Sequence, residues 1–184
     1  MANPEIKLIR IKENNLQELQ DLSRQTFFDT YGWGNTAENM QIYLNRCFST
    51  EKLKFELNNS DSEFFFAQLE GAVVGYLKLN YGSAQTEFQE ENGMEVERIY
   101  VVKEYQGKKI GRLLIKKAID LGIARNMDYL WLGVWERNPK AISFYEKSGF
   151  SHIGEHTFML GTDKQTDFVF KKNLQGADTI LLHK

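Results

Sequence analysis

The segment from Gln106 to Arg112 has the composition of a phosphate-binding turn. Lys108, Lys109 and Arg112 supply positive charge, and the turn lies between a strand-forming stretch and a run of apolar residues at helical spacing. A strand that enters a helix through such a turn presents free backbone N–H groups at the positive end of the helix dipole, where phosphate binds. An amphipathic helix with a solvated basic face is the alternative, and both interpretations fit this stretch alone.

The elements that must position this turn alternate between strands and helices. Period-two patterns and β-branched or aromatic runs predict strands at residues 6–11, 63–69, 72–81, 99–102, 129–134, 150–159 and 166–171. Helical spacing predicts helices at residues 16–31, 36–48, 49–58, 110–126 and 140–148. Strands interleaved with helices indicate an α/β or α+β protein with a mixed sheet. Gly133 lies inside a predicted strand, where glycine marks close approach of another group.

Composition limits the classes of protein that fit. A chain of 184 residues, 42% hydrophobic and 26% charged, is expected to form one domain, here residues 1–172, followed by a tail, residues 173–184. A formal net charge of −2 argues against nucleic acid or an anionic membrane as the partner. The single cysteine argues against a cysteine-based metal site, and we predict no metal. It also suits a reducing cytosol, and no N-terminal or longer apolar segment is present, so we predict a cytoplasmic protein. A homodimer is one alternative for its assembly.

Two segments resemble the signatures of one enzyme family. Residues 106–111, Gln-Gly-Lys-Lys-Ile-Gly, resemble the Gln/Arg-x-x-Gly-x-Gly/Ala signature of the GCN5-related N-acetyltransferases (GNAT), and residues 138–150 resemble their second signature. The two occur in order, about thirty residues apart, with a predicted strand between them. Residues 131–138 and 161–167 further resemble the bacterial PaiA-type spermidine/spermine N-acetyltransferases.

The resemblance implies a mostly antiparallel seven-stranded sheet, flanked by helices, whose two central strands splay apart to hold acetyl-CoA. The pantetheine arm would pair with the strand, the pyrophosphate would bind the turn amides, and Gly133 would leave room opposite. Asn138 would hydrogen-bond the pantetheine amide. The residues expected to contact acetyl-CoA are Ile99, Tyr100, Val101, Gln106, Gly107, Lys108, Lys109, Ile110, Gly111, Arg112, Asn138 and Tyr145.

Lys109 departs from the family pattern, which has glycine at this position. Phosphate contacts at such a turn are mainly backbone N–H groups. We therefore expect a lysine with helical dihedral angles to replace the glycine and to change the grip on phosphate.

Two residues are predicted to move protons. The resemblance implies that Tyr145 protonates the departing thiolate, and the alternative is a core aromatic on a helix. Glu97 begins the central strand nine residues before Gln106, where related polyamine acetyltransferases carry a basic carboxylate. We predict Glu97 to be the general base, through water, with an exposed strand-end carboxylate as the alternative.

A polyamine is the predicted acceptor, because several ammonium groups on an aliphatic chain need carboxylates and aromatic faces. Tyr31, Trp33 and Trp135 are expected to supply the faces. Carboxylates crowd the entry to the central strand at Glu87, Glu90, Glu91, Glu95 and Glu97. An ordinary solvated acidic loop is the alternative. The late histidines, His152 and His156, are expected to be surface or core residues.

Two other functions fit the same segments. The first is a sensor that binds acetyl-CoA with little turnover. The second is acetylation of another amine, such as a protein amine or a different small molecule. In each, the basic turn keeps its phosphate-binding role.

Overall fold

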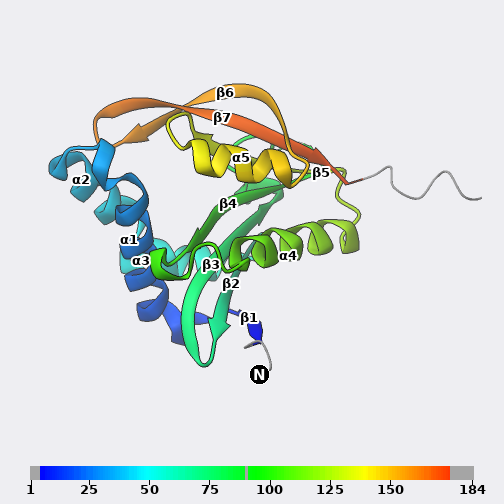
Figure 1. The fold of residues 1–184 in the computed structure, drawn as a ribbon, viewed down its shortest axis with the longest axis horizontal. Coiled ribbons are helices and arrows are strands. Elements are labelled where there is room, and N and C mark those ends of the chain that lie inside the picture. Colours follow the sequence, from blue (N-terminus) through cyan, green and yellow to red (C-terminus); the bar gives the residue numbers. More distant parts are fainter. Residues whose placement is uncertain (1–4, 90, 175–184) are drawn as a thin grey trace, which may run out of the picture.

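The computed structural model describes residues 5–89 and 91–174 and contains a seven-stranded sheet in the order β1-β2-β3-β4-β5-β7-β6 (Figure 1). The strands are β1 (Ile6–Arg10), β2 (Ser62–Leu69), β3 (Ala72–Tyr81), β4 (Gly93–Val101), β5 (Tyr129–Trp135), β6 (Ser151–Leu160) and β7 (Asp163–Asn173). Neighbouring strands are antiparallel except β4 and β5, which are parallel. The predicted mixed sheet is confirmed.

The α-helices of the described part flank the sheet in two groups (Figure 1). They are α1 (Leu16–Tyr31), α2 (Ala37–Cys47), α3 (Thr50–Leu57), α4 (Ile110–Ala124) and α5 (Pro139–Lys147). Thr36 and Ser49 cap α2 and α3, because their hydroxyls accept the N–H of Asn39 at 3.2 Å and of Lys52 at 3.1 Å. All the predicted helices are present, with small shifts at their ends.

The side chains of β2 alternate between two hydrophobic cores. Phe64 and Phe66 pack with buried residues of α1, α2 and α3. Phe65 and Ala67 pack with buried residues of α4 and with Tyr145 of α5. Since successive strand residues face opposite sides of a sheet, α1–α3 cover one face and α4–α5 the other.

The two central strands part after a short paired segment. β4 and β5 pair only at Gly93↔Tyr129, Met94↔Leu130 and Glu95↔Trp131. The other edge of β4 stays paired with β3 as far as Val101. The predicted splay between the central strands is therefore confirmed, and it opens toward the C-terminal ends of β4 and β5.

The last strand extends slightly past the predicted domain boundary. Asn173 ends β7 and pairs with Tyr129 of β5. Leu174 packs against the buried core on the α4 side. Residues 175–184 of the predicted tail lie outside the described residues.

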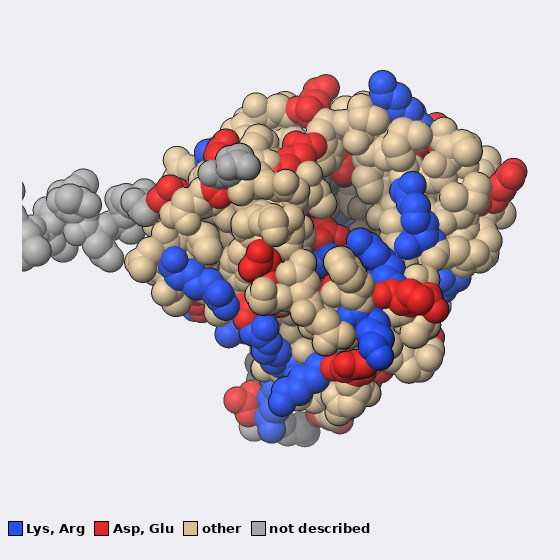
Figure 2. Space-filling model, turned by 180° about the vertical axis from the view of Figure 1, so that it is seen from behind, with Lys and Arg blue, Asp and Glu red and all other residues tan. Residues whose placement is uncertain are grey.

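Basic and acidic side chains are interspersed on the face of the molecule that Figure 2 shows. This distribution agrees with the small net charge of −2. Among the helices of the described residues, none combines the length and the apolar character that crossing a bilayer requires.

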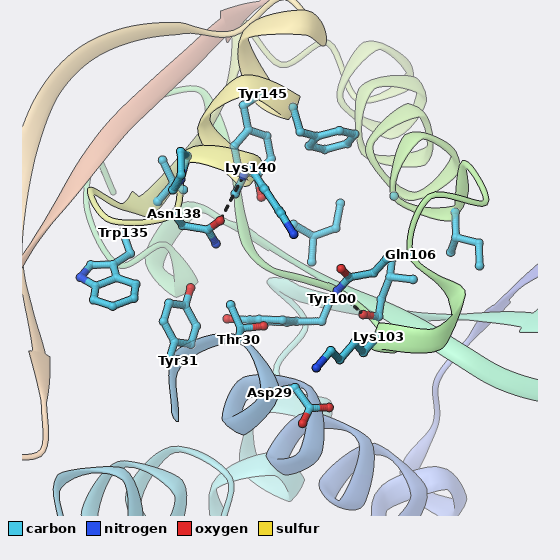
Figure 3. A pocket seen from close by; sticks show the side chains of 18 of the residues that line it. Asp29, Thr30, Tyr31, Tyr100, Lys103, Gln106, Trp135, Asn138, Lys140 and Tyr145 are labelled. Carbon is cyan, nitrogen blue, oxygen red and sulfur yellow. Dashed lines mark hydrogen bonds between the residues drawn. The ribbon is translucent and has the colours of Figure 1, made fainter. Parts of the chain in front are cut away.

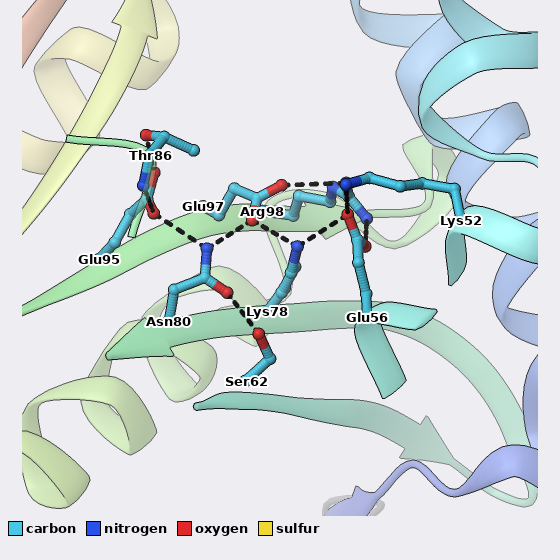
Figure 4. Close-up of polar contacts among 9 residues, drawn as sticks. All are labelled: Lys52, Glu56, Ser62, Lys78, Asn80, Thr86, Glu95, Glu97 and Arg98. Atoms are coloured by element: carbon cyan, nitrogen blue, oxygen red, sulfur yellow. Dashed lines mark hydrogen bonds and ion pairs between the residues drawn. The ribbon is translucent and has the colours of Figure 1, made fainter. Parts of the chain in front are cut away.

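A buried ionic network joins α3 to β3 and β4 (Figure 4). Glu56 accepts hydrogen bonds from Arg98 at 2.8 and 3.0 Å and lies 3.1 Å from Lys78 Nζ. These three side chains are buried, with 5%, 7% and 3% exposure. Both cations also contact Glu97, at 2.5 Å from Lys78 and 2.9 Å from Arg98. Each charge depends on the others, since a buried ion without its partner is strongly destabilising.

Glu56→Gln is expected to lower the free energy of unfolding by about 3 kcal/mol, because two buried cations lose a shared counter-charge. Urea unfolding at equilibrium measures the change. Lys52→Gln is the matched control: Lys52 contacts the same carboxylate at 3.3 Å but is 46% exposed. We expect it to cost less than about 0.5 kcal/mol, and an equal loss in both variants would contradict the role of burial.

Candidate active site

The edge of β4 that faces the splay carries backbone groups that have no partner on β5. Val102 donates its N–H to Val74 O at 2.9 Å, so its backbone is directed toward β3. Successive residues of a strand direct these groups to opposite edges, so those of Ile99 and Val101 point into the gap. The backbone of Tyr100 points to β3, which removes the predicted backbone contact between Tyr100 and a ligand.

The turn between β4 and α4 contains two residues in the left-handed region. Gly107 has φ 79°, and Lys109, at the N-cap of α4, has φ 66° and ψ 8°. The helical dihedral angles expected for Lys109 are therefore wrong. A side chain in this region costs about 1 kcal/mol. The turn still places the free first amides of α4 at the opening of the splay.

Side chains around the turn differ in what they face. The side chain of Gln106 donates to Val101 O at 3.2 Å and so ties the turn to the strand. Lys109 and Arg112 line the cavity described next, and Lys103 adds a further cation. Lys108 instead lies over the ring of Tyr105, with Nζ 4.6 Å from the ring centre, and is absent from the lining.

A cavity of about 780 Å³, here called the first cavity, fills the splay (Figure 3). It collects residues from α1, β4, the turn, β5 and α5. The predicted site residues in its lining are Tyr31, Trp33, Glu97, Ile99, Tyr100, Val101, Gln106, Gly107, Lys109, Ile110, Gly111, Arg112, Trp135, Asn138 and Tyr145. The structure thus brings together every predicted site residue except Lys108.

The N-terminal half of α5 contributes two functional groups. Asn138 is the N-cap, and its Oδ1 accepts the N–H of Ala141 at 3.1 Å, which leaves its Nδ2 free to donate. Tyr145 points into the first cavity and is 7% exposed (Figure 3). Burial raises the pKa of Tyr145, with a further contribution from Tyr31, so the phenol keeps its proton at neutral pH.

A second cavity of about 410 Å³ adjoins the first. The two share Tyr31, Glu97, Tyr100 and Gly133 in their walls, so they meet at the splay. Four carboxylates line the second cavity: Glu87, Glu95, Glu97 and Asp167. It is the part of the site with the chemistry to receive a cation.

The two carboxylates of β4 that face the second cavity have opposite pKa shifts. Burial would raise the pKa of Glu97, but Arg98, Lys78 and Asn80 together lower it to about 2. Burial and the charge of Glu97 raise the pKa of Glu95 to about 7, against hydrogen bonds from Thr86 and Asn80. An anion as stable as Glu97 accepts protons poorly, which argues against its predicted role as general base.

Other predicted acidic residues are dispersed. Glu87 lies 2.7 Å from His156 Nδ1, and Glu91 accepts a hydrogen bond from the hydroxyl of Tyr129. Glu90 lies outside the described residues. Only Glu87, Glu95 and Glu97 of the predicted group therefore line the second cavity.

Two residues of the second cavity were not predicted as site residues. His156 of β6 and Asp167 of β7 pair across the hairpin and both line the second cavity. His156 was expected at the surface or in the core, and the structure places it in the cavity wall. Gly133 explains the position: a Cβ there would lie 3.0 Å from His156 Nε2. His156 therefore occupies the space beside Gly133, and Gly133 also lines the first cavity.

Three aromatic side chains form the wall between α1 and β5. Trp135 is 3% exposed, and its ring centre lies 5.6 Å from that of Tyr31 and 5.5 Å from that of Trp33. Trp33 is 72% exposed at the mouth of the first cavity. Gly34 permits this packing, because a Cβ there would lie 2.6 Å from the ring of Trp135.

A splayed sheet with a basic turn at a helix N-terminus defines a protein that binds an extended, phosphate-bearing molecule. The model of the acetyltransferase (GNAT) family matches residues 16–150. An uncharacterized N-acetyltransferase in the pepI 3' region of Lactobacillus delbrueckii subsp. lactis is 41% identical over 169 residues, covering 92% of this chain and 98% of the relative. The chain therefore belongs to the GNAT family and is an N-acetyltransferase.

More distant relatives include an enzyme with a named substrate and a protein solved with a ligand. The spermidine N(1)-acetyltransferase of Thermoplasma acidophilum is 26% identical over 149 residues, covering 79% of this chain and 88% of that protein. The crystal structure of the PaiA N-acetyltransferase of Thermoplasma acidophilum in complex with coenzyme A has a TM-score of 0.77 and 25% identity, and the match covers 92% of this chain and 99% of that one.

Lys109→Gly is expected to be more stable than Lys109→Ala by about 1 kcal/mol, because alanine keeps the Cβ in the left-handed conformation and glycine removes it. Both variants lose the same charge, so the comparison isolates backbone strain. Urea unfolding of the two proteins gives the difference. An alanine variant as stable as the glycine variant would contradict the left-handed conformation at residue 109.

Proposed function

We propose that this N-acetyltransferase moves the acetyl group of acetyl-CoA to a primary amine of a polyamine such as spermidine or spermine. The observation that carries the proposal is the meeting of two cavities with opposite chemistry at the splay. The first has a basic turn and free strand amides, and the second has four carboxylates. An anionic donor and a cationic acceptor can therefore approach each other from the two cavities.

The first cavity is the proposed acetyl-CoA site. The pyrophosphate binds the turn amides beside Lys109 and Arg112, and the pantetheine arm pairs with Ile99 and Val101. Asn138 donates Nδ2 to a pantetheine carbonyl. The coenzyme A complex of the Thermoplasma acidophilum protein supports this assignment.

The reaction needs a base, an oxyanion donor and an acid. The amine nitrogen attacks the thioester carbonyl carbon after losing a proton to the base. The N–H of Val101 points into the gap and is the proposed donor to the oxyanion. The C–S bond then breaks, the nitrogen gives its second proton to solvent to form the neutral amide, and the thiolate takes the phenolic proton of Tyr145, which solvent restores.

Glu95 is the proposed general base in place of Glu97. Its pKa of about 7 lets it hold and release a proton near neutral pH. Glu97, fixed by Lys78 and Arg98, stays charged and attracts the ammonium group. Because Glu95 is 4% exposed, we propose that it takes the amine proton through water.

The polyamine assignment rests on the carboxylates of the second cavity and on the activity for which distant relatives are named. Spermidine N(1)-acetyltransferases from Thermoplasma acidophilum and Vibrio cholerae are 26% and 23% identical to this chain. A cationic acceptor brings positive charge to a cavity lined by four carboxylates, which a neutral or anionic acceptor does not.

A thiol-release assay with 5,5′-dithiobis(2-nitrobenzoate) tests the proposal across a panel of amines. Rapid release of CoA with spermidine and spermine is expected. Turnover confined to a protein amine or an aminoglycoside would overturn the polyamine acceptor and keep the acetyl transfer. Tight binding of acetyl-CoA without turnover of any amine would favour a sensor.

Tyr145→Phe is expected to lower kcat with spermidine about 100-fold, because the departing thiolate loses its proton donor. The KM for acetyl-CoA should change little, since the ring still fills the cavity wall. Steady-state kinetics with an unchanged melting temperature separate catalysis from folding. A kcat close to the wild-type value would reassign Tyr145 to packing alone.

Replacement of each β4 carboxylate distinguishes the two candidate bases. For the wild type, kcat/KM should rise with pH through about pH 7, as Glu95 loses its proton. Glu95→Gln should remove this rise and keep only the increase from titration of the amine itself, near pH 10. Glu97→Gln should keep the rise but move it to lower pH, because the charge of Glu97 raises the pKa of Glu95. The opposite pattern would return the role of base to Glu97.

A further inference from the structure

His156 lies between two carboxylates in the wall of the second cavity and is a cation when its imidazole is protonated. Its Nδ1 lies 2.7 Å from Glu87 Oε1, and its Nε2 lies 3.7 Å from Asp167 Oδ2. The three side chains come from β6, β7 and the segment before β4. Their side-chain exposures are 19% for His156, 13% for Asp167 and 40% for Glu87, so a ligand in the cavity can reach them.

Asp167 has an unused acceptor. Within the described residues, its Oδ1 is buried and has no hydrogen-bond partner. A buried carboxylate oxygen without a donor is costly, so positive charge placed close to Asp167 stabilises this carboxylate.

The two arginines that line the second cavity contact other groups. Arg98 contacts Glu56 and Glu97, and Arg46 donates to Met159 O at 3.2 Å. The titratable and charged groups that line the cavity with His156 are Tyr31, Tyr43, Arg46, Cys47, Glu87, Glu95, Glu97, Arg98, Tyr100 and Asp167. Of the cations among them, His156 is the one in contact with Glu87 and Asp167.

We infer that Glu87 and Asp167 bind a second ammonium group of the acceptor, and that protonated His156 competes with this ammonium for the same two carboxylates. The inference rests on the proposed function, and it adds where the second ammonium group binds and how pH changes its binding. A neutral imidazole leaves two negative charges for the ligand, whereas an imidazolium leaves one. His156 therefore makes selection for an acceptor with several amines depend on pH.

The pH range follows from the contacts of His156. The carboxylate of Asp167, 3.7 Å from Nε2, raises the pKa of His156 above its ordinary value, opposed by burial and reinforced by Glu87. As the pH rises through the pKa of His156, the imidazole loses its charge. The preference for a second ammonium group should increase over the same range, because the competing cation disappears.

Spermidine and N-butyl-1,3-diaminopropane are the matched probes, since the analogue lacks only the terminal amine of the aminobutyl arm. For the wild type with acetyl-CoA, the ratio of the analogue KM to the spermidine KM should rise about tenfold between pH 6 and pH 8.5, the change expected for one charge-assisted hydrogen bond. A ratio that does not change with pH would overturn the inference.

Three variants test which residues cause the pH dependence of the KM ratio. His156→Gln should give a ratio independent of pH, at the value that the wild type reaches at high pH. Asp167→Asn should raise the spermidine KM about tenfold and leave the analogue KM nearly unchanged. His152→Gln is the control on the same strand, where the ring is exposed and lies against Phe168, and it should keep the wild-type pH dependence.

A binding measurement on the wild-type chain avoids any effect of substitutions on folding. By linkage, spermidine should lower the pKa of His156, measured by NMR of labelled histidine in the CoA complex, while the analogue should not. An unshifted His156 would overturn the inference. Failure of both amines to be acetylated would overturn the proposed function, whereas the NMR titration would still decide whether Glu87 and Asp167 bind the ammonium.

Discussion

The unpaired edge of β4 is the constraint on which the site depends. Backbone N–H and C=O groups in a protein interior need partners, and those of Ile99 and Val101 lose β5 once pairing ends at Glu95. A ladder that continued would satisfy them and remove both cavities. Buried side chains of Ile110 and Tyr145 lie in the same core cluster as Val96 and Val134 and help to hold the strands apart. The open sheet is therefore compatible with folding when a strand-like ligand can complete it.

The same strand gives two carboxylates different chemistry. Glu95 and Glu97 lie on one face, but Glu97 meets Lys78 and Arg98, whereas Glu95 meets neutral donors from Thr86 and Asn80. Counter-charges stabilise an anion more than hydrogen bonds from neutral groups do, so the two pKa values separate. One strand can thus hold a permanent negative charge beside a group that exchanges protons near neutral pH. The buried network with Glu56 makes this difference part of the fold.

Local sequence patterns predicted the helices and strands. The chemistry of the site was harder to predict, because it depends on contacts between residues that are far apart in the sequence. The hairpin turn at Glu70-Gly71 has φ values of 52° and 85°, as its position between two strand patterns suggests. The left-handed Lys109 could not be predicted in this way, because most non-glycine residues avoid that region. Nor could the weak basicity of Glu97, since it arises from its contacts with Lys78 on β3 and Arg98 on β4. Spacing identifies which residues meet but not what else they contact.

Gly133 shows what a local sequence pattern can and cannot predict. Glycine in a strand predicted a close approach, and the approaching groups are His156 and Asp167 from the β6-β7 hairpin. The family match ends at residue 150, before that hairpin begins. The turn at residues 106–112 and the N-terminus of α5 lie in the matched segment, whereas five residues of the second-cavity wall, on β6 and β7, lie outside it. Under the proposed function, substitutions in β6 and β7 would change the acceptor cavity without changing the residues proposed to bind acetyl-CoA.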